Sequence, residues 1–129
     1  MEITLTAGQV ERLASIAKGA LPNESCAFLL GKDGRVTEIL PMRNVDESQV
    51  SFSIEPQEVL YAYEFAESKK LQVVGIFHSH PARPAPSGTD REFMEINPMV
   101  WLIYSTTEHR FKAYVYDSDV REVAVIITG

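Results

Sequence analysis

The sequence of 129 residues has a single cysteine, Cys26, and only three histidines. One thiol excludes an internal disulfide framework and a metal site built from cysteines. Basic residues are also few: 12 Lys and Arg face 18 Asp and Glu, which gives a net charge of -6 and a pI near 5.0. An acidic chain of this kind lacks the positive surface that binds a phosphate backbone. Nucleic acid is therefore not an expected partner.

Long apolar runs are absent as well. No segment approaches the roughly 20 apolar residues of a membrane helix, and residues 1–4 lack the basic region and apolar core of a signal peptide. The expected location is the cytoplasm, with no membrane partner. Hydrophobic content of 45% and charged content of 23% are typical of a soluble globular protein. The length fits one domain, residues 1–129, whose core needs no metal, so that any metal is free to be catalytic.

The expected secondary structure alternates between helices and strands. Apolar residues recur at spacings of three and four in residues 9–20, and similar faces predict helices at 56–70 and 88–96. Thr6 is the expected N-cap of the first helix. Apolar, β-branched and aromatic runs predict strands at 25–31, 35–41, 52–54, 71–77, 99–104, 111–116 and 122–127. This order predicts a single-domain α/β fold with a mixed β-sheet flanked by helices.

One apolar strand, residues 71–77, runs directly into His78 and His80. Because strand side chains alternate between faces, both histidines point the same way, with Cα atoms about 6.5 to 7 Å apart. Two imidazoles at that separation can reach one zinc ion with bonds of about 2.0 to 2.1 Å. Two such histidines are more often packing or surface residues, however, so the pair alone does not identify a metal site.

Asp90 is the candidate third ligand. It follows His80 by ten positions, across a loop that contains three prolines, and their fixed φ lowers the entropy lost when the loop is held closed. Two histidines and a carboxylate leave a fourth position open, as in catalytic zinc sites. Ser87, one helical turn earlier, can donate a hydrogen bond to an oxygen that gains charge. The same Ser87-x-x-Asp90 pattern is also a helix-capping box that needs no catalytic role.

A hydrolytic site also needs a base, and Glu24 is the candidate among the 18 acidic residues. It directly precedes the expected central strand at 25–31 and is not on a solvated helix face. Taken alone, Glu24 is more simply a solvated turn residue. The metal hypothesis rests on the combination of Glu24, Ser87, Asp90 and the two histidines in a consistent strand and helix context.

Together these residues resemble the JAMM (MPN+) zinc metalloproteases, particularly the compact prokaryotic members. The motifs are His78-Ser79-His80-Pro81, Pro86-Ser87-x-x-Asp90 and the upstream Glu24, and the similarity covers nearly the whole chain. The resemblance implies a fold similar to cytidine deaminases. It also implies zinc-dependent hydrolysis of a peptide or isopeptide bond at the C-terminal Gly-Gly of a ubiquitin-like or sulfur-carrier protein.

The resemblance further implies a role for each residue. His78, His80 and Asp90 would bind one Zn²⁺ per chain, Glu24 would act as general base and then acid, and Ser87 would steady the tetrahedral intermediate. One departure stands out, because nine residues separate His80 from Asp90, one fewer than the family usually has. The missing residue is placed in the loop 82–85, and Glu92 becomes the fallback ligand if the shorter loop displaces Asp90.

Two other functions are weighed against this one. A non-catalytic scaffold of the same fold would bind a ubiquitin-like domain, but such relatives typically lack part of the ligand set, and all five positions are present here. Nucleobase deamination usually requires a Pro-Cys-x-x-Cys ligand pair, and Cys26 is the only cysteine. A homodimer is expected only if an apolar helix face remains that the sheet does not cover.

Overall fold

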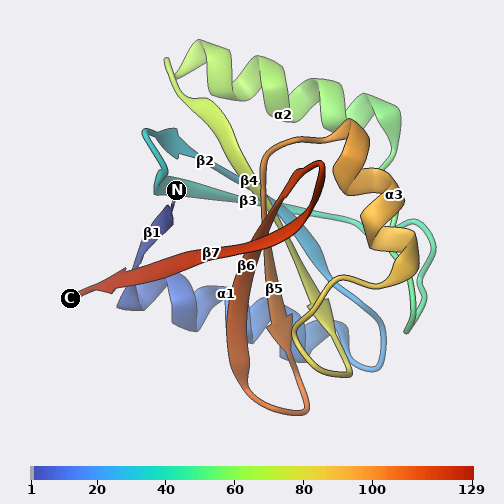
Figure 1. Ribbon diagram of the computed structural model, residues 1–129. Coiled ribbons are helices and arrows are strands. Elements are labelled where there is room, and N and C mark those ends of the chain that lie inside the picture. Colours follow the sequence, from blue (N-terminus) through green and yellow to red (C-terminus); the bar gives the residue numbers. More distant parts are fainter. Residues whose placement is uncertain (1) are drawn as a thin grey trace.

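The computed structural model describes residues 2–129, which form one α/β domain with a mixed sheet and three helices (Figure 1). In chain order the elements are β1 (Glu2–Thr6), α1 (Ala7–Ala20), β2 (Cys26–Lys32), β3 (Arg35–Met42), α2 (Pro56–Ser68), β4 (Gln72–His80), α3 (Gly88–Ile96), β5 (Val100–Ser105), β6 (Arg110–Asp117) and β7 (Asp119–Thr128). None of the helices in this described range has the length and apolar character needed to cross a membrane. The predicted fold class is confirmed.

The seven strands lie in the order β1-β3-β2-β4-β5-β6-β7, and the sheet closes into a barrel because β1 also pairs with β7. The pairing of β1 with β7 is parallel and runs from Glu2 to Thr6, whereas β1 meets β3 only at Thr4 and Arg35. At the centre, β4 is antiparallel to β2 and parallel to β5. The sheet was predicted to be mixed, but its closure was not predicted.

The structure confirms the predicted N-cap of α1 but not the strand predicted at 52–54. Thr6 caps α1 as predicted: its Oγ1 accepts a hydrogen bond from the Gln9 N–H at 3.1 Å, and its own N–H donates to Gln9 Oε1 at 2.9 Å. The strand predicted at 52–54 is wrong, since these residues lie outside the sheet. The Ser53 N–H donates to the Asn44 side chain and its carbonyl accepts from Val45, so this backbone pairs with its own loop.

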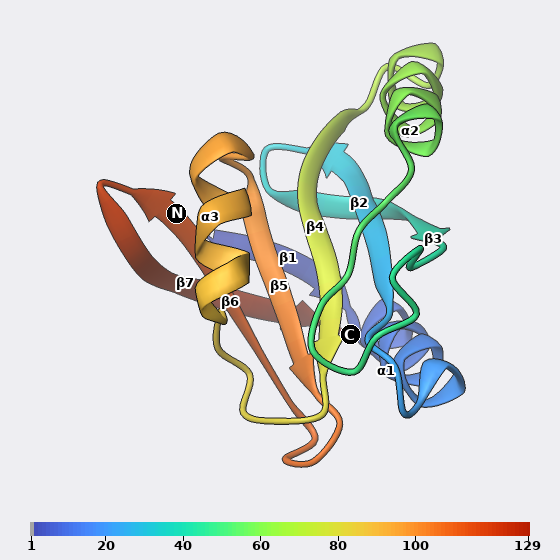
Figure 2. The ribbon, with the colours of Figure 1, turned by 90° about the vertical axis from the view of Figure 1, so that its right-hand side faces the viewer.

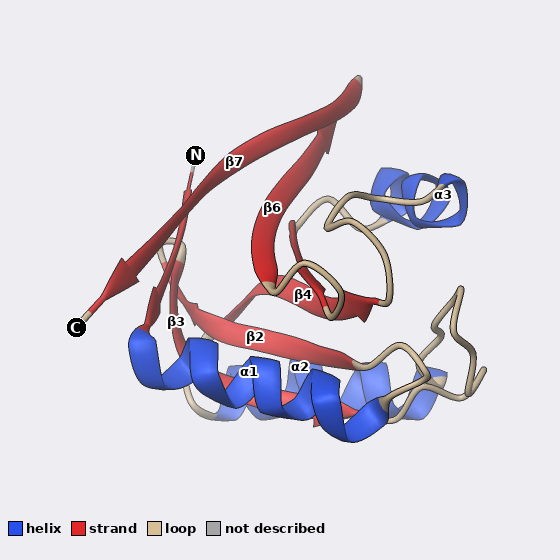
Figure 3. Cartoon of the chain, turned by 90° about the horizontal axis from the view of Figure 1, so that it is seen from below, coloured by secondary structure: helices blue, strands red, loops and turns tan. Residues whose placement is uncertain are grey.

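The core is divided between the two faces of the barrel wall. An inner cluster combines residues of all seven strands with Leu13 and Ala17 of α1. An outer cluster covers β2, β4 and β5 with Ala62 and Ala66 of α2 and Met94 of α3. Figure 3 shows the strands around the interior, and Figure 2 shows α2 and α3 outside it. Strand β4 contributes to both clusters, because its successive side chains alternate between the faces.

Candidate active site

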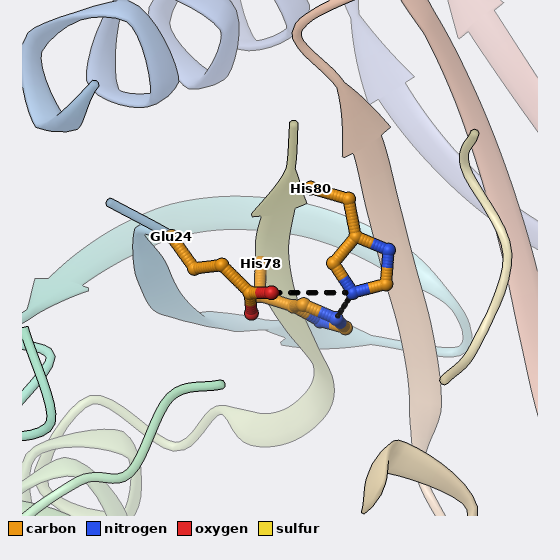
Figure 4. A group of neighbouring side chains, drawn as sticks. All are labelled: Glu24, His78 and His80. Carbon is orange, nitrogen blue, oxygen red and sulfur yellow. Dashed lines mark hydrogen bonds and ion pairs between the residues drawn. The ribbon is translucent and has the colours of Figure 1, made fainter. Parts of the chain in front are cut away.

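The two histidines at the end of β4 lie on the outer face and turn toward each other (Figure 4). Their Nε2 atoms are 2.9 Å apart, and the His78 side chain is fully buried. Phe52 stacks on the His78 ring with centroids 4.7 Å apart, and Trp101 meets the same ring edge-on at 5.7 Å. These aromatic walls leave the imidazole little freedom, so its nitrogen is held in one direction.

Asp90 reaches both histidines despite the shortened loop. Its Oδ2 lies 3.2 Å from His78 Nε2 and 3.1 Å from His80 Nε2. The same oxygen accepts the Ser87 N–H at 2.9 Å, while Ser87 Oγ accepts the Asp90 N–H at 3.1 Å. The capping box is therefore real, and it also aims Asp90 at the histidines. Glu92, the fallback ligand, is exposed on α3.

These three atoms form a nearly regular triangle with edges of 2.9, 3.1 and 3.2 Å. Hydrogen bonds cannot fill all three edges when Asp90 is ionised, because each imidazole carries at most one proton on Nε2. A tetrahedral ion with bonds of about 2.0 to 2.1 Å holds its ligand atoms roughly 3.3 Å apart, which is close to every edge. The donor set of two imidazoles and one carboxylate thus fits a small metal cation.

Glu24 lies just before β2 and turns its carboxylate toward this triangle (Figure 4). It is 3% exposed, its Oε2 is 3.7 Å from His80 Nε2, and its Oε1 has no hydrogen-bond partner in residues 2–129. Glu24, His78 and His80 lie close enough together to share one ion. The shorter contacts of Asp90 make it the better third donor, and Glu24 would then lie beside an ion held there.

Burial shapes the charges of the site. It raises the pKa of Glu24 to about 7, an effect that His80 opposes and that Asp90 and Asp46 reinforce. Burial also disfavours ionisation of Asp90, but hydrogen bonds with His78 and His80 hold the pKa of this carboxyl well below its usual range. The pKa of His78 is lowered, chiefly by burial. The pKa values of the two carboxyl groups are thus shifted in opposite directions within one site, which is common at functional sites.

Comparison with known proteins identifies the family. Residues 6–116 match the family described as prokaryotic homologs of the JAB domain. The chain belongs to this family. The family resemblance inferred from the histidine, serine and aspartate motifs is thereby confirmed.

Individual JAB-domain relatives agree with this assignment. A desampylase from Pyrococcus furiosus is 42% identical over 107 residues, which cover 81% of this chain and 76% of the relative. The solution structure of a Desulfitobacterium hafniense protein matches with a TM-score of 0.85 at 34% identity and covers 99% of this chain and 93% of its own. A JAB1/MPN domain protein from Archaeoglobus fulgidus, with a TM-score of 0.65 at 21% identity and coverage of 96% and 99%, shows the fold alone.

Two residues that the sequence analysis missed hold the JAB-domain site together. Ser79, between the histidines, accepts the Ser25 N–H on its Oγ at 2.9 Å, and its own N–H donates to the Ser25 carbonyl at 3.1 Å. Asn44 is buried, and its Nδ2 donates to the Glu24 carbonyl at 3.0 Å. A polar residue inside an apolar strand was the available signal for Ser79, whereas Asn44 stood among several polar loop residues.

Proposed function

We propose that this protein is a zinc-dependent isopeptidase that cleaves at the C-terminal Gly-Gly of a ubiquitin-like or sulfur-carrier protein. The convergence of His78, His80 and Asp90 on one position, with Glu24 beside it, is the observation that carries the proposal. The desampylase relative removes a ubiquitin-like modifier, which supports the substrate class.

Each side chain has a distinct task in this proposal. Zinc held by His78, His80 and Asp90, one ion per chain, would lower the pKa of a water molecule and polarise the scissile carbonyl. The Glu24 carboxylate takes a proton from the attacking water and returns it to the leaving amine. A pKa near 7 suits both halves of that transfer, which typically contributes about 10² to 10⁴ in rate.

Ser87 is assigned to stabilise the carbonyl oxygen of the scissile bond. Its Oγ accepts the Asp90 N–H at 3.1 Å, which fixes the oxygen but leaves the hydroxyl proton free. That proton is donated to the carbonyl oxygen as negative charge develops there, the task of an oxyanion-hole donor. The capping role and the catalytic role are therefore compatible in one side chain.

The Gly-Gly tail enters extended and is held through its backbone, because glycine offers no side chain to bind. Residues 51–55 lie outside the sheet, and Phe52 in this segment stacks on His78. Because the Ser53 backbone is bonded within its own loop, the groups left to pair with a tail would be those of Phe52 and Ile54. Strands β5 and β6 pair on both edges and offer no free edge to a tail.

Cleavage of defined conjugates tests this proposal. The zinc-loaded protein is incubated with each ubiquitin-like protein of its own genome, joined through Gly-Gly to lysine or to a short peptide, and products are followed by mass. Glu24→Gln with the same zinc content is the matched control and should not turn over. If zinc is bound and no conjugate is cleaved, the isopeptidase proposal fails. A protein that takes up no zinc under repletion is instead a scaffold for a ubiquitin-like domain.

A further inference from the structure

A basic pocket lies beside the candidate metal centre on a chain whose net charge is -6. It has a volume of about 260 Å³ and is bounded by residues 83–85 and by side chains at the start of β6 and the turn before it. Arg83, Arg110 and Lys112 line it, and Glu108 is its only acidic wall residue. Three basic side chains therefore gather around one pocket, although the protein as a whole is acidic.

The strand register places this pocket on the same face as the histidines. His80 pairs with Ser105, which pairs with Arg110 on β6. His78 is connected to Lys112 in the same way through Ile103. Paired positions on neighbouring strands point to the same face, so Arg110 and Lys112 project outward with the histidines. Two strand spacings put their Cα atoms about 10 Å from those of the two histidines.

The loop that forms one side of the pocket is anchored to its other side. Tyr114 of β6, which also lines the pocket, donates its hydroxyl proton to the Pro84 carbonyl at 2.8 Å. The backbone of Arg83 in turn lies close enough to the His80 side chain to raise the pKa of that imidazole. The short loop is therefore anchored to β6 through Pro84 and lies against His80 at Arg83. It connects the candidate metal ligands to the basic side chains of the pocket.

Existing ion pairs neutralise the pocket only in part. Arg110 lies 3.7 Å from Glu108 and Lys112 lies 3.6 Å from Glu122, and all four side chains are at least one-third exposed. Exposed pairs of this kind are weak and exchange partners readily. The pocket therefore offers three cationic side chains to an incoming carboxylate. Arg83 has no ion pair with residues 2–129, and the ion pairs of Arg110 and Lys112 are weak.

We propose that this pocket binds acidic side chains of the lysine-bearing protein from which the modifier is removed; this rests on the proposed isopeptidase function. The modifier tail is assigned to the Glu24 side of β4, along residues 51–55, which lie outside the sheet and place Phe52 against His78. The lysine-bearing chain would then lie on the other side of β4, over β5 and β6. The scissile bond is at the end of the lysine side chain, and the backbone advances about 3.3 to 3.6 Å per extended residue, so acidic side chains two or three positions from the lysine can reach a pocket at this distance.

Synthetic substrates test the preference directly. Three peptides carry a ubiquitin-like protein of the same genome, each such protein tried in turn, joined through its Gly-Gly to one lysine, and they differ only at the positions two and three residues away, which are Asp, Asn or Lys. We expect the zinc-loaded wild type to cleave the Asp peptide best and the Lys peptide worst, with kcat/KM differing roughly three- to tenfold between these extremes, chiefly through KM. The preference should weaken as salt is added, because exposed charges are screened.

Charge reversal supplies the matched comparison. Arg110→Glu lowers the charge of the lining side chains from +2 to zero, so it should abolish the difference between the Asp and Lys peptides without changing the zinc content. Arg121→Glu makes the same change at an exposed arginine of β7, 3.5 Å from Asp117 and outside the pocket, and should keep the wild-type order. Arg83→Glu, a loop substitution that leaves the backbone contact to His80 in place, repeats the test if Arg110→Glu unfolds.

The outcomes separate the two proposals. If zinc is bound and none of the three peptides is cleaved, the isopeptidase function fails. If the Asn peptide is cleaved and the flanking charge makes no difference, the function stands and the pocket assignment is overturned. Equal responses of Arg110→Glu and Arg121→Glu also overturn it, since they would report net charge and not this pocket.

Discussion

The inner and outer faces of β4 show how one strand serves both packing and chemistry. Phe77 points inward, is fully buried, and joins a cluster made only of hydrophobic residues. Its neighbour His78 points outward, is equally buried, and meets His80 and Asp90. A single step along the backbone thus separates a residue that stabilises the barrel from one assigned to the metal.

The two faces also differ in how well their polar groups are satisfied. On the outer side, Glu24 Oε1 and His78 Nδ1 are buried without a hydrogen-bond partner among residues 2–129. Burial of an unsatisfied polar atom costs about 1 to 3 kcal/mol. The inner cluster carries no such cost, so we infer that the barrel interior supplies the stability that the outer site gives up for function.

The largest effect is expected where the proposed metal site is broken. Asp90→Asn preserves side-chain size and the capping position but removes the charge that faces both histidines. We expect zinc binding to weaken severely and cleavage to fall below detection, as measured by titration calorimetry and by the conjugate assay. Glu92→Gln, on the same helix but exposed, is the control. Full activity of Asp90→Asn would show that Asp90 is not a ligand.

A large effect on rate alone is expected from Glu24→Gln, which should lower kcat by about 10² to 10⁴ while one zinc remains bound. In the wild type, kcat/KM should rise with pH as the Glu24 carboxyl ionises, because a base acts in its ionised form. Its pKa is about 7 without a metal, and a bound cation lowers it, so this rise should occur at or below pH 7. Activity within a few-fold of wild type in the glutamine variant would contradict the assignment.

The inner face should respond in the opposite way. Phe77→Ala removes a large side chain from the barrel interior and should cost about 3 to 5 kcal/mol of unfolding free energy. The ligands lie on the other face, so the folded fraction should keep its zinc stoichiometry and kcat. Urea unfolding measures the free energy of unfolding, and separate kinetics at one temperature under native conditions measure kcat. A proportionate loss of kcat in folded protein would show that the two faces are coupled.

The smallest effect compares the two capping boxes of the molecule. Thr6→Ala and Ser87→Ala each remove a side-chain acceptor at a helix N-terminus and should each cost about 1 kcal/mol of stability. Only Ser87→Ala should also reduce kcat, because only that hydroxyl faces the proposed oxyanion. Thermal melts and kcat measured side by side distinguish the roles. Equal kcat values in the two variants would reduce Ser87 to a helix cap.

Local patterns predicted much of this structure. Spacings of three and four located the helices, α3 with its observed bounds, and period-two alternation placed His78 and His80 on one face. The sequence analysis missed β1, although Ile3 and Leu5 alternate with polar residues, because its stability comes from pairing with β7 at the far end of the chain. Alternation over five residues does not by itself reveal a pairing partner more than 100 residues away.

The site was predicted less completely than the fold. The motif spacing indicated that Glu24, Asp90 and the histidines would meet, and they do. The supports could not be foreseen in the same way. Phe52 was expected in a strand but instead stacks on His78 from a loop, and Asn44 fixes that loop and Glu24 through contacts 7 to 20 residues apart. Such contacts depend on the folded path of the loop and not on any periodic pattern.

Anomalous scattering from crystals would locate the zinc ion directly. Crystals of the zinc-loaded protein, measured on both sides of the zinc absorption edge, show where the ion lies. We expect one ion per chain, bonded to Nε2 of His78, Nε2 of His80 and Oδ2 of Asp90 at about 2.0 to 2.2 Å, with Glu24 unbonded beside it. An ion held by Glu24 in place of Asp90, or no ion between the histidines, would contradict it.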